Sequence, residues 1–374
     1  MTQVLVVDDS RFMRTVLGDA LEREGYDIVR VDSGEAAVEY ATTHDPDVVT
    51  MDVEMPGMSG IEAVERIMST NPTSILMLSA HTERGADATL DALARGAVDF
   101  LHKPDGSDSR NLAHLVDDLV GTVESIVAAD VSSVALARAA ATARRMETHA
   151  RKHKRTIPAG GAVDEGPVGE PLPVGPFVDD PTIVVGASTG GPRILERFMA
   201  RLPAELDAKL LVVQHMPAAF TERFADRLDE VSDYDVFEAA HSDRLAGGQA
   251  VVAAGDHHLE VASNRESALR VRRSSADRVH GVRPAIDVTM ETAAEVVSDP
   301  LCGIVLTGMG RDGARGIEAV AGAGGHTIAQ DERTSPVFGI PRQAIATGCV
   351  EDVVPADRLV ERVLETFTVG EIDG

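Results

Sequence analysis

Short apolar runs alternate with longer amphipathic stretches through the first third of the chain. The runs have the length of buried strands, and the longer stretches show the apolar spacing of helices. The predicted strands are Val4–Val7, Ile28–Val31, Val48–Met51, Ile75–Leu78 and Phe100–Leu101. The predicted helices are Arg11–Glu24, Gly34–Thr42, Gly60–Ser69, Ala86–Arg95 and Leu112–Ala128. This alternation predicts helices packed on a parallel sheet, in a first domain over residues 1–128.

The same alternation resumes near residue 181. The predicted strands are Thr182–Val185, Leu210–Val213, Ala250–Ala253, Gly303–Leu306, Thr327–Ala329 and Val350–Val353. The predicted helices are Arg193–Arg201, Phe220–Leu228, Asp287–Val297, Ala314–Ala321 and Ala356–Thr366. We therefore expect an α/β protein with two doubly wound parallel-sheet domains. The first is flavodoxin-like, and the second, over residues 181–370, is a Rossmann-like three-layer domain.

Residues 129–180 lack this periodicity and are predicted to form a linker. An Ala- and Arg-rich stretch ends in Arg151–Arg155, the only basic cluster of the chain. Pro158–Pro181 then repeats Pro, Gly and acidic residues, a composition that buries too little apolar surface to order itself. The basic cluster fits either a solvated helix end or a docking site for an acidic surface, and both interpretations stay open.

Composition narrows the classes of protein to consider. The chain has 374 residues, of which 61 are acidic and 35 basic, so its formal net charge is −26. A field of that sign repels phosphate backbones and anionic lipids. Cys302 and Cys349 are too few for a disulfide framework, and no uncharged apolar stretch approaches the roughly 18 residues of a membrane span. We expect a cytoplasmic protein that binds no nucleic acid and does not insert into membranes.

Polar residues follow the predicted strands of the first domain. Asp8 and Asp9 follow the first strand, and Asp52 follows the third. The carboxyl ends of parallel strands meet at one sheet edge, where like charges this close repel unless a cation joins them, and carboxylate oxygens suit Mg²⁺. Ser79 and Lys103 follow the fourth and fifth strands. A nucleophilic acid, a metal, a hydroxyl and an ammonium are what phosphoryl transfer to a carboxylate requires.

The segments that carry these residues resemble the signature of response-regulator receiver domains, over residues 1–128. They are Val6–Ser10, Met51–Pro56, Ser79–Ala80 and Phe100–Pro104. The resemblance implies that Asp52 is the phosphoacceptor and that a chemotaxis histidine kinase is the phosphodonor. It implies an Mg²⁺ site formed by Asp8, Asp9, Asp52 and the backbone carbonyl of Glu54. It also implies a switch formed by Ser79, Phe100 and Lys103, in which Ser79 keeps the hydroxyl of the more common Thr.

In the second domain, Gly186–Gly191 contains G-x-S-x-G at a predicted strand-to-helix turn. Such glycines can admit a phosphate to a helix N-terminus, or they can expose the hydroxyl of Ser188 on a tight turn. The segment lacks the Lys-Ser/Thr pair of a Walker loop, and the next strand ends in Gln214 and His215 instead of a ribose-binding acid. A serine nucleophile is therefore favoured, with nucleotide binding as the open alternative.

A serine nucleophile needs a base, and the base needs an orienting acid at the same sheet edge. His215 ends the second strand of the domain, and Asp312 follows a later strand. His257 and His258 are rival bases, and Asp256 is a rival acid, because all three follow another strand.

Glycines favour the set that contains Asp312. Gly308, Gly310 and Gly313 keep the loop before and after Asp312 open for a substrate. They also leave backbone N–H groups free for an oxyanion hole, and we expect its donors at Met309 and Thr189.

The chain order Ser, His, Asp differs from that of ordinary α/β-hydrolases. Residues 182–367 instead resemble the catalytic domain of the chemotaxis protein-glutamate methylesterase. The segments that carry the resemblance are Gly186–Gly191, Gln214–Pro217, Gly255–Leu259, Arg283–Asp287, Thr307–Gly313 and Phe338–Arg342. It implies that Ser188, His215 and Asp312 are the nucleophile, the base and the orienting acid. Ala285 stands where related sequences often have Ser.

Together the two resemblances imply a phosphorylation-activated esterase for chemotactic adaptation. It would hydrolyse glutamate methyl esters on methyl-accepting chemoreceptors through an acyl-enzyme, would also deamidate receptor glutamines, and would need no cofactor beyond receiver Mg²⁺. A linker of this composition transmits no force, so we expect the unphosphorylated receiver to cover the Ser188 site directly, through its fourth strand, last helix and neighbouring loops. The alternative is a response regulator with a non-catalytic or DNA-binding output domain.

Overall fold

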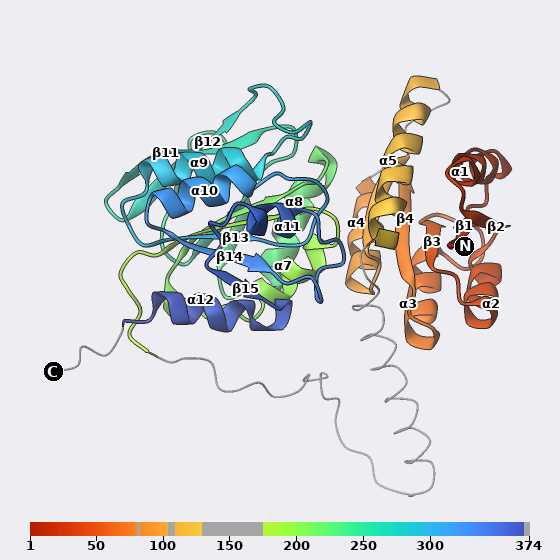
Figure 1. The fold of residues 1–374 in the computed structure, drawn as a ribbon, viewed down its shortest axis with the longest axis horizontal. Helices are drawn as coiled ribbons and strands as arrows, with labels where there is room; N and C mark the ends of the chain where they lie inside the picture. Colours follow the sequence, from red (N-terminus) through yellow and green to blue (C-terminus); the bar gives the residue numbers. More distant parts are fainter. Residues whose placement is uncertain (81–82, 104–108, 129–174, 370–374) are drawn as a thin grey trace, which may run out of the picture.

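The computed structural model describes residues 1–80, 83–103, 109–128 and 175–369. The first domain has five parallel strands in the order β2-β1-β3-β4-β5 (Figure 1). The strands are β1 (Gln3–Val7), β2 (Asp27–Val31), β3 (Val48–Asp52), β4 (Ser74–Ala80) and β5 (Asp99–Lys103). The helices are α1 (Arg11–Arg23), α2 (Gly34–His44), α3 (Gly60–Thr70), α4 (Glu83–Ala94) and α5 (Ser109–Ala128). The predicted α/β class is confirmed.

The start of α3 approaches the strand that carries Asp52. Ser59 caps the helix with its side chain, and Glu62 completes the capping box. A Cβ atom at Gly60 would lie 1.9 Å from the backbone oxygen of Asp52. The absence of a side chain at Gly60 therefore lets α3 begin directly against the end of β3.

The second domain is built on seven parallel strands in the order β15-β14-β13-β6-β7-β10-β8. The strands are β6 (Thr182–Ala187), β7 (Lys209–Gln214), β8 (Asp235–Glu238), β10 (Gln249–Val252), β13 (Leu301–Val305), β14 (His326–Gln330) and β15 (Asp352–Val354). The helices are α7 (Gly191–Met199), α8 (Ala218–Val231), α9 (Ile286–Val296), α10 (Ala314–Gly322), α11 (Ile340–Ala346) and α12 (Leu359–Phe367), with 3₁₀ turns at Ala204–Leu206 and Ala356–Arg358. The strand order reverses between β6 and β13, and open α/β sheets bind ligands at such a switch point.

A second, antiparallel sheet was not predicted. It contains β9 (Arg244–Leu245), β11 (His258–Arg265) and β12 (Ala268–Ser274), in the order β11-β12-β9. The register of β11 shifts between Val261 and Ser263, which interrupts the alternation of apolar and polar residues. The prediction also missed β8 and α11, which have only four and seven residues.

The two domains pack against each other through the β5 edge of the first sheet (Figure 1). Helix α4 contacts α7 and α8. Phe100 on β5 lies against Phe220 on α8, with ring centroids 4.5 Å apart. Asp91 on α4 and Arg227 on α8 form an ion pair of 3.2 Å. Because residues of both domains belong to one apolar cluster, the core continues across the domain boundary.

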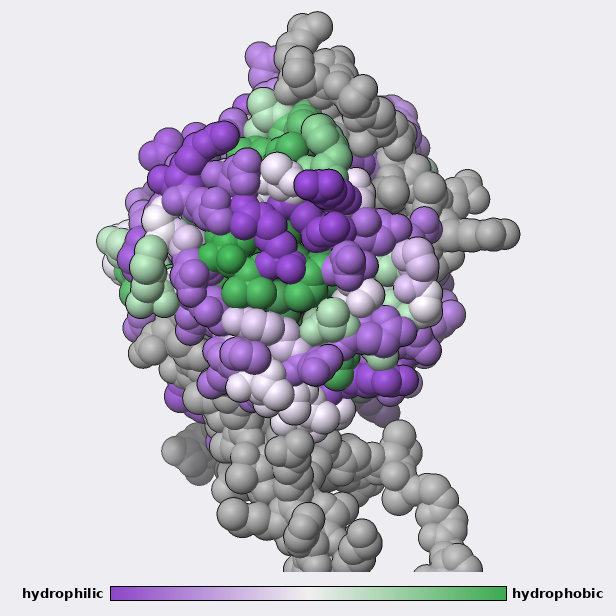
Figure 2. Space-filling model, turned by 90° about the vertical axis from the view of Figure 1, so that its right-hand side faces the viewer, coloured by the Kyte–Doolittle hydropathy of each residue, from purple (hydrophilic) through white to green (hydrophobic). Residues whose placement is uncertain are grey.

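The β2 edge of the first sheet faces away from the second domain. Figure 2 shows this end of the molecule, where hydrophobic residues gather inside a hydrophilic surround.

No helix in the described ranges is both long and apolar enough to cross a membrane. Most of the predicted linker, residues 129–174, lies outside the described residues, and so does the basic cluster Arg151–Arg155.

Candidate active sites

Three carboxylates of the first domain meet at the carboxyl end of its sheet. Oxygen atoms of Asp8, Asp9 and Asp52 lie within 4.8 Å of one another. The ammonium of Lys103 lies 2.6 Å from Asp8 Oδ2 and 2.7 Å from Asp52 Oδ1. Burial raises the pKa of Asp52 to about 6, although the charge and hydrogen bond of Lys103 oppose this shift. A cluster of hard oxygen donors that still carries excess negative charge fits a divalent cation such as Mg²⁺.

The other residues predicted for this pocket lie at different depths. Ser79 is fully buried on β4, where it is in register with His102 of β5. Glu54 is exposed in the loop that follows β3. Phe100 lies at the domain boundary against Phe220, so the predicted switch residues extend from the acidic pocket to the second domain.

Ser188 lies in the turn between β6 and α7, at the switch point of the seven-stranded sheet. Gly190 closes this turn with a φ of +78°, which L side chains rarely adopt. The loop after β13 passes so close that a Cβ at Gly308 would lie 2.6 Å from the Cβ of Ser188. Glycine at these two positions therefore brings the serine turn and the β13 loop together.

His215 and Asp312 meet beside this turn. His215 Nε2 lies 2.8 Å from Asp312 Oδ2. Asp312 also accepts hydrogen bonds from the backbone N–H groups of Ile286 (2.7 Å) and Asp287 (3.0 Å). Burial alone would raise the pKa of Asp312, but the hydrogen bond and charge of His215, together with the two N–H groups, outweigh it and lower that pKa. The carboxylate is therefore held ionised and oriented toward the ring.

A cavity of about 500 Å³ joins these residues, and Ser188, Thr189, His215, Met309 and Asp312 all line it. In the described part of the chain, the backbone N–H groups of Thr189 and Met309 donate to no protein atom. The same part contains no hydrogen bond between the Ser188 hydroxyl and the His215 ring. Such contacts often tighten only when substrate binds.

The receiver forms the opposite wall of this cavity. Asp99 and Leu101 of β5 line it, together with Asp117, Asp118, Gly121 and Thr122 of α5. The Asp99 carboxylate accepts a hydrogen bond from Thr189, the residue next to Ser188. Burial raises the pKa of Asp99 to about 6, and the hydrogen bond from Thr189 opposes the shift. The first domain therefore covers the cavity through β5 and the middle of α5, so the last helix lies there as expected, but β5 takes the place of the expected fourth strand.

Both domains of this chain are similar to known proteins. Residues 183–363 match the family model of the CheB methylesterase, and residues 4–116 match that of the response regulator receiver domain. The protein-glutamate methylesterase/protein-glutamine glutaminase of Haloarcula marismortui is 49% identical, over 98% of this chain and 98% of its own length. The chain belongs to the CheB methylesterase family.

Further CheB proteins are also similar to this chain. The protein-glutamate methylesterase/protein-glutamine glutaminase of Halobacterium salinarum is 48% identical over 98% of this chain and 99% of its own length. The crystal structure of the Thermotoga maritima CheB methylesterase catalytic domain has 38% sequence identity and a TM-score of 0.47, and the match covers 49% of this chain and 97% of that one.

The rival residues of this CheB chain lie away from the serine cavity. His258 is buried, accepts the N–H of Ala285 at Nδ1 and contacts the carbonyl of Asp277 through Nε2. His257 contacts the carbonyl of Gly255, and Asp256 pairs with Arg278. The hydrogen bonds and the ion pair of these three residues are made with neighbours outside the serine cavity, so a structural role explains them.

Ala285 occupies the N-cap position of α9, where no side chain caps the helix. A serine at this position would offer a capping hydroxyl, which alanine lacks.

The sequence did not single out His280 or the structural role of Asp287. Asp287 is fully buried, and its Oδ1 accepts the N–H groups of Gly313 and Gly316, each at 2.8 Å. Its Oδ2 lies 2.8 Å from His280 Nε2, and His280 lines the serine cavity. Asp287 thus fixes the turn after Asp312 through these hydrogen bonds. In the sequence, an acid at the start of a predicted helix was the only hint of this role, because its partners belong to a segment about 26 residues away.

Proposed function

We propose that this chain hydrolyses glutamate methyl esters on methyl-accepting chemoreceptors and also deamidates receptor glutamines, under the control of phosphorylation at Asp52. The convergence of Ser188, His215 and Asp312 at the switch point, in a cavity that the receiver covers, carries this proposal. The match of residues 183–363 to the CheB methylesterase model argues against the DNA-binding alternative.

In the proposed reaction, His215 acts as the base. Since Nε2 contacts Asp312, the other ring nitrogen, Nδ1, is the atom left to take the proton from Ser188. The serine oxygen attacks the ester carbon, and the N–H groups of Thr189 and Met309 stabilise the oxyanion. His215 then gives its proton to the leaving group, which departs as methanol from an ester or as ammonia from a glutamine, and an acyl-enzyme remains. Water activated by His215 releases glutamate and restores the serine.

In the receiver, Asp52 is the proposed phosphoacceptor. Asp8, Asp9, Asp52 and the backbone carbonyl of Glu54 would hold Mg²⁺, which supplies charge neutralisation for the phosphoryl oxygens when bound. A chemotaxis histidine kinase would donate the phosphoryl group. Lys103 already contacts Asp8 and Asp52, so it is placed to pair with a phosphoryl oxygen on Asp52.

The proposed control acts through the domain contact. Phosphorylation at Asp52 would reposition Ser79 and Phe100, and Phe100 packs directly on Phe220 of α8. Helix α8 begins at Ala218, three residues after His215. Movement of the β5–α5 face would open the Ser188 cavity to a receptor, because that face forms the cavity wall.

Methanol release from methylated receptors tests the proposal. Wild-type protein treated with Mg²⁺ and a small acyl-phosphate donor should release methanol faster than untreated protein, and Ser188→Ala should release none above background. Undiminished release by Ser188→Ala would reject the serine mechanism.

A further inference from the structure

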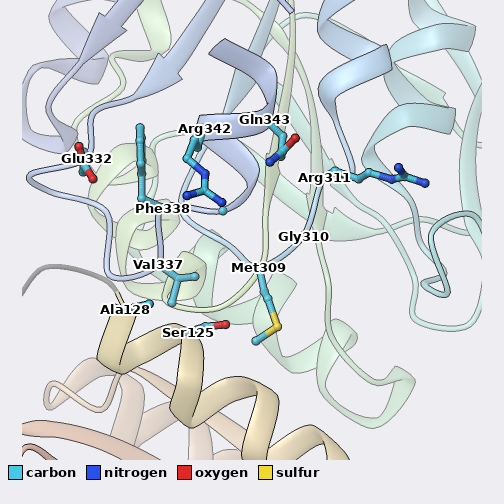
Figure 3. A pocket seen from close by; sticks show the side chains of 11 residues that line it. Ser125, Ala128, Met309, Gly310, Arg311, Glu332, Val337, Phe338, Arg342 and Gln343 are labelled. Atoms are coloured by element: carbon cyan, nitrogen blue, oxygen red, sulfur yellow. The ribbon is translucent and has the colours of Figure 1, made fainter. Parts of the chain in front are cut away.

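A second cavity lies directly beside the oxyanion loop. Its volume is about 420 Å³, and Phe338, Arg342 and Gln343 line one side while Ser125 and Ala128 of α5 line the other (Figure 3). Met309, Gly310 and Arg311 line both this cavity and the serine cavity. The two cavities therefore share the loop that carries the proposed oxyanion donor.

The segment with Phe338 is tied rigidly to that loop. Gly308 N–H donates to the carbonyl of Val337 at 2.9 Å, and the N–H groups of Gly339 and Ile340 donate to the Gly308 carbonyl at 3.0 and 2.8 Å. A Cβ at Gly339 would lie 2.6 Å from that carbonyl oxygen, so the two loops approach as closely as backbone allows. A molecule bound at Phe338 is thereby held in fixed register with Ser188.

Two arginines that line this cavity form no ion pair within the described ranges of the chain. Many other arginines of the second domain pair with a carboxylate: Arg201, Arg227, Arg272, Arg278, Arg315, Arg358 and Arg362. Arg342 and Arg311 form no ion pair with any described residue, although the chain carries a net charge of −26. The same is true of several other arginines of this domain, namely Arg193, Arg197, Arg244, Arg265, Arg270, Arg273 and Arg283, so what sets Arg342 and Arg311 apart is their place in the lining of this cavity. Figure 3 shows Arg342, Phe338 and Glu332 on the same side of this cavity, so its lining includes one acid besides the two arginines.

The receiver helix shows what shape fits across both cavities. Asp117, Asp118, Gly121 and Thr122 of α5 line the serine cavity, and Ser125 and Ala128 line the second one. Spacings of three and four residues place these side chains on one face of the helix. A helix lying in the same place would present one residue to Ser188 and another, about two turns away, to Arg342.

We propose that Phe338 and Arg342 form a recognition cleft for an acidic helix of the substrate protein, occupied when the receiver leaves. This inference rests on the proposed esterase function and names the substrate feature that it selects. Ester hydrolysis and glutamine deamidation both leave a carboxylate on the substrate, so a helix with several sites becomes more acidic with each turnover. The Arg342 guanidinium can bind such a carboxylate in bidentate geometry, while Phe338, which lines the same cavity, packs against the apolar part of the helix.

The test uses full-length protein activated with Mg²⁺ and a small acyl-phosphate donor, and a receptor fragment methylated at one glutamate. Two fragments are compared, one with glutamates about seven residues on each side of the ester and one with glutamines there. For wild type, the acidic fragment should have a KM about tenfold lower at similar kcat. Arg342→Gln should remove this difference, and Arg342→Lys should retain part of it. Arg333→Gln, which removes a charge paired with Asp331 outside the cleft, should behave as wild type.

Equal KM values for the two fragments in wild type would overturn the cleft, while methanol release would leave the esterase assignment standing. Absence of methanol release from either fragment would instead reject the proposed function. A change in Arg342→Gln that is the same for both fragments would show that the arginine holds part of this chain, which also overturns the proposal. Should Arg342→Gln fail to fold, the comparison of Arg342→Lys with wild type tests the proposal. A KM difference between the two fragments that is unaltered in Arg342→Lys would argue against bidentate binding by the arginine.

Discussion

Asp52 and Asp312 are both buried carboxylates at the carboxyl end of a parallel sheet, yet their surroundings shift their pKa values in opposite directions. Burial raises the pKa of Asp52 to about 6, and the neighbouring charges of Asp8 and Asp9 add to this shift. The ammonium of Lys103, which contacts both Asp8 and Asp52, lowers the pKa but does not outweigh them. The pKa of Asp312 is lowered, since a histidine and two backbone N–H groups outweigh its burial. The first site is left short of positive charge, as a site for a metal and a phosphoryl group must be. In the second site, His215 and the backbone already supply the hydrogen bonds that keep the Asp312 carboxylate ionised.

The largest expected effect breaks the second site. His215→Ala should lower methanol release by on the order of 10⁶-fold, as Ser188→Ala does, because members of such a triad act as a unit. His257→Ala is the matched control and should retain wild-type activity. Loss of activity in His257→Ala with survival in His215→Ala would show that the base is assigned wrongly. Melting curves should be similar for all three variants.

Asp312→Asn tests whether that carboxylate must stay charged. We expect a loss on the order of 10⁴-fold in kcat with KM little changed, because the amide imposes the wrong orientation or tautomer on His215. Phosphorylation of Asp52 by a small donor should be unaffected in this variant. A loss below tenfold would show that the backbone N–H groups of Ile286 and Asp287 do not hold a functional charge.

Asp52→Asn makes the same change at the first site and should act differently. Labelling by a phosphodonor should disappear, because the amide offers no anionic oxygen to phosphorylate, and stimulation of the esterase should vanish with it. Unstimulated esterase activity should remain at the wild-type level.

Deleting residues 1–175 should instead raise the unstimulated esterase activity, as expected if the receiver wall blocks the cavity. A truncated protein no more active than the unphosphorylated whole would point to activation by contact.

The domain contact itself can be loosened at Phe220. Phe220→Leu should raise unstimulated activity several-fold, because it removes the ring contact with Phe100 but preserves an apolar core residue. Phe224→Leu, one turn further along α8, controls for altered packing within the helix core and should not raise activity. Methanol release without phosphodonor is the measurement, and equal rates for the two variants would argue against Phe100 as the contact that holds the wall.

Asp99 carries the smallest expected effect, which depends on pH. Its pKa of about 6 in the docked state exceeds the ordinary value of 3.8, so protonation favours docking, and docking weakens as pH rises toward 6. Asp99→Asn should stay docked at all pH values. The ratio of its unstimulated activity to that of wild type should therefore be near one below about pH 4 and fall several-fold by about pH 6, with little further change above. Using this ratio cancels the pH dependence of the esterase reaction itself, and a ratio independent of pH would exclude Asp99 from the docking equilibrium.

Much of this protein follows from local patterns. The βα alternation predicted both parallel sheets, because buried parallel strands and amphipathic helices have different apolar periods. The strand ends at Asp8, Asp52, Ser188 and His215 predicted two sites, because parallel strands bring their carboxyl ends to one edge whatever their order. The short β8 and the interrupted β11 escaped, since too few residues alternate there to give a signal.

Tertiary structure alone decided which surfaces meet. No local pattern places Asp99 beside Thr189, Phe100 on Phe220 or α5 across the serine cavity, because these contacts join residues more than 60 positions apart through side-chain packing. The same holds for Arg342, whose lack of an ion pair among the described residues becomes visible only when its neighbours are known. Periodicity and strand ends are properties of one segment, and they determined the chemistry. Docking and recognition depend on the shape and charge of two surfaces together, which only the folded chain determines.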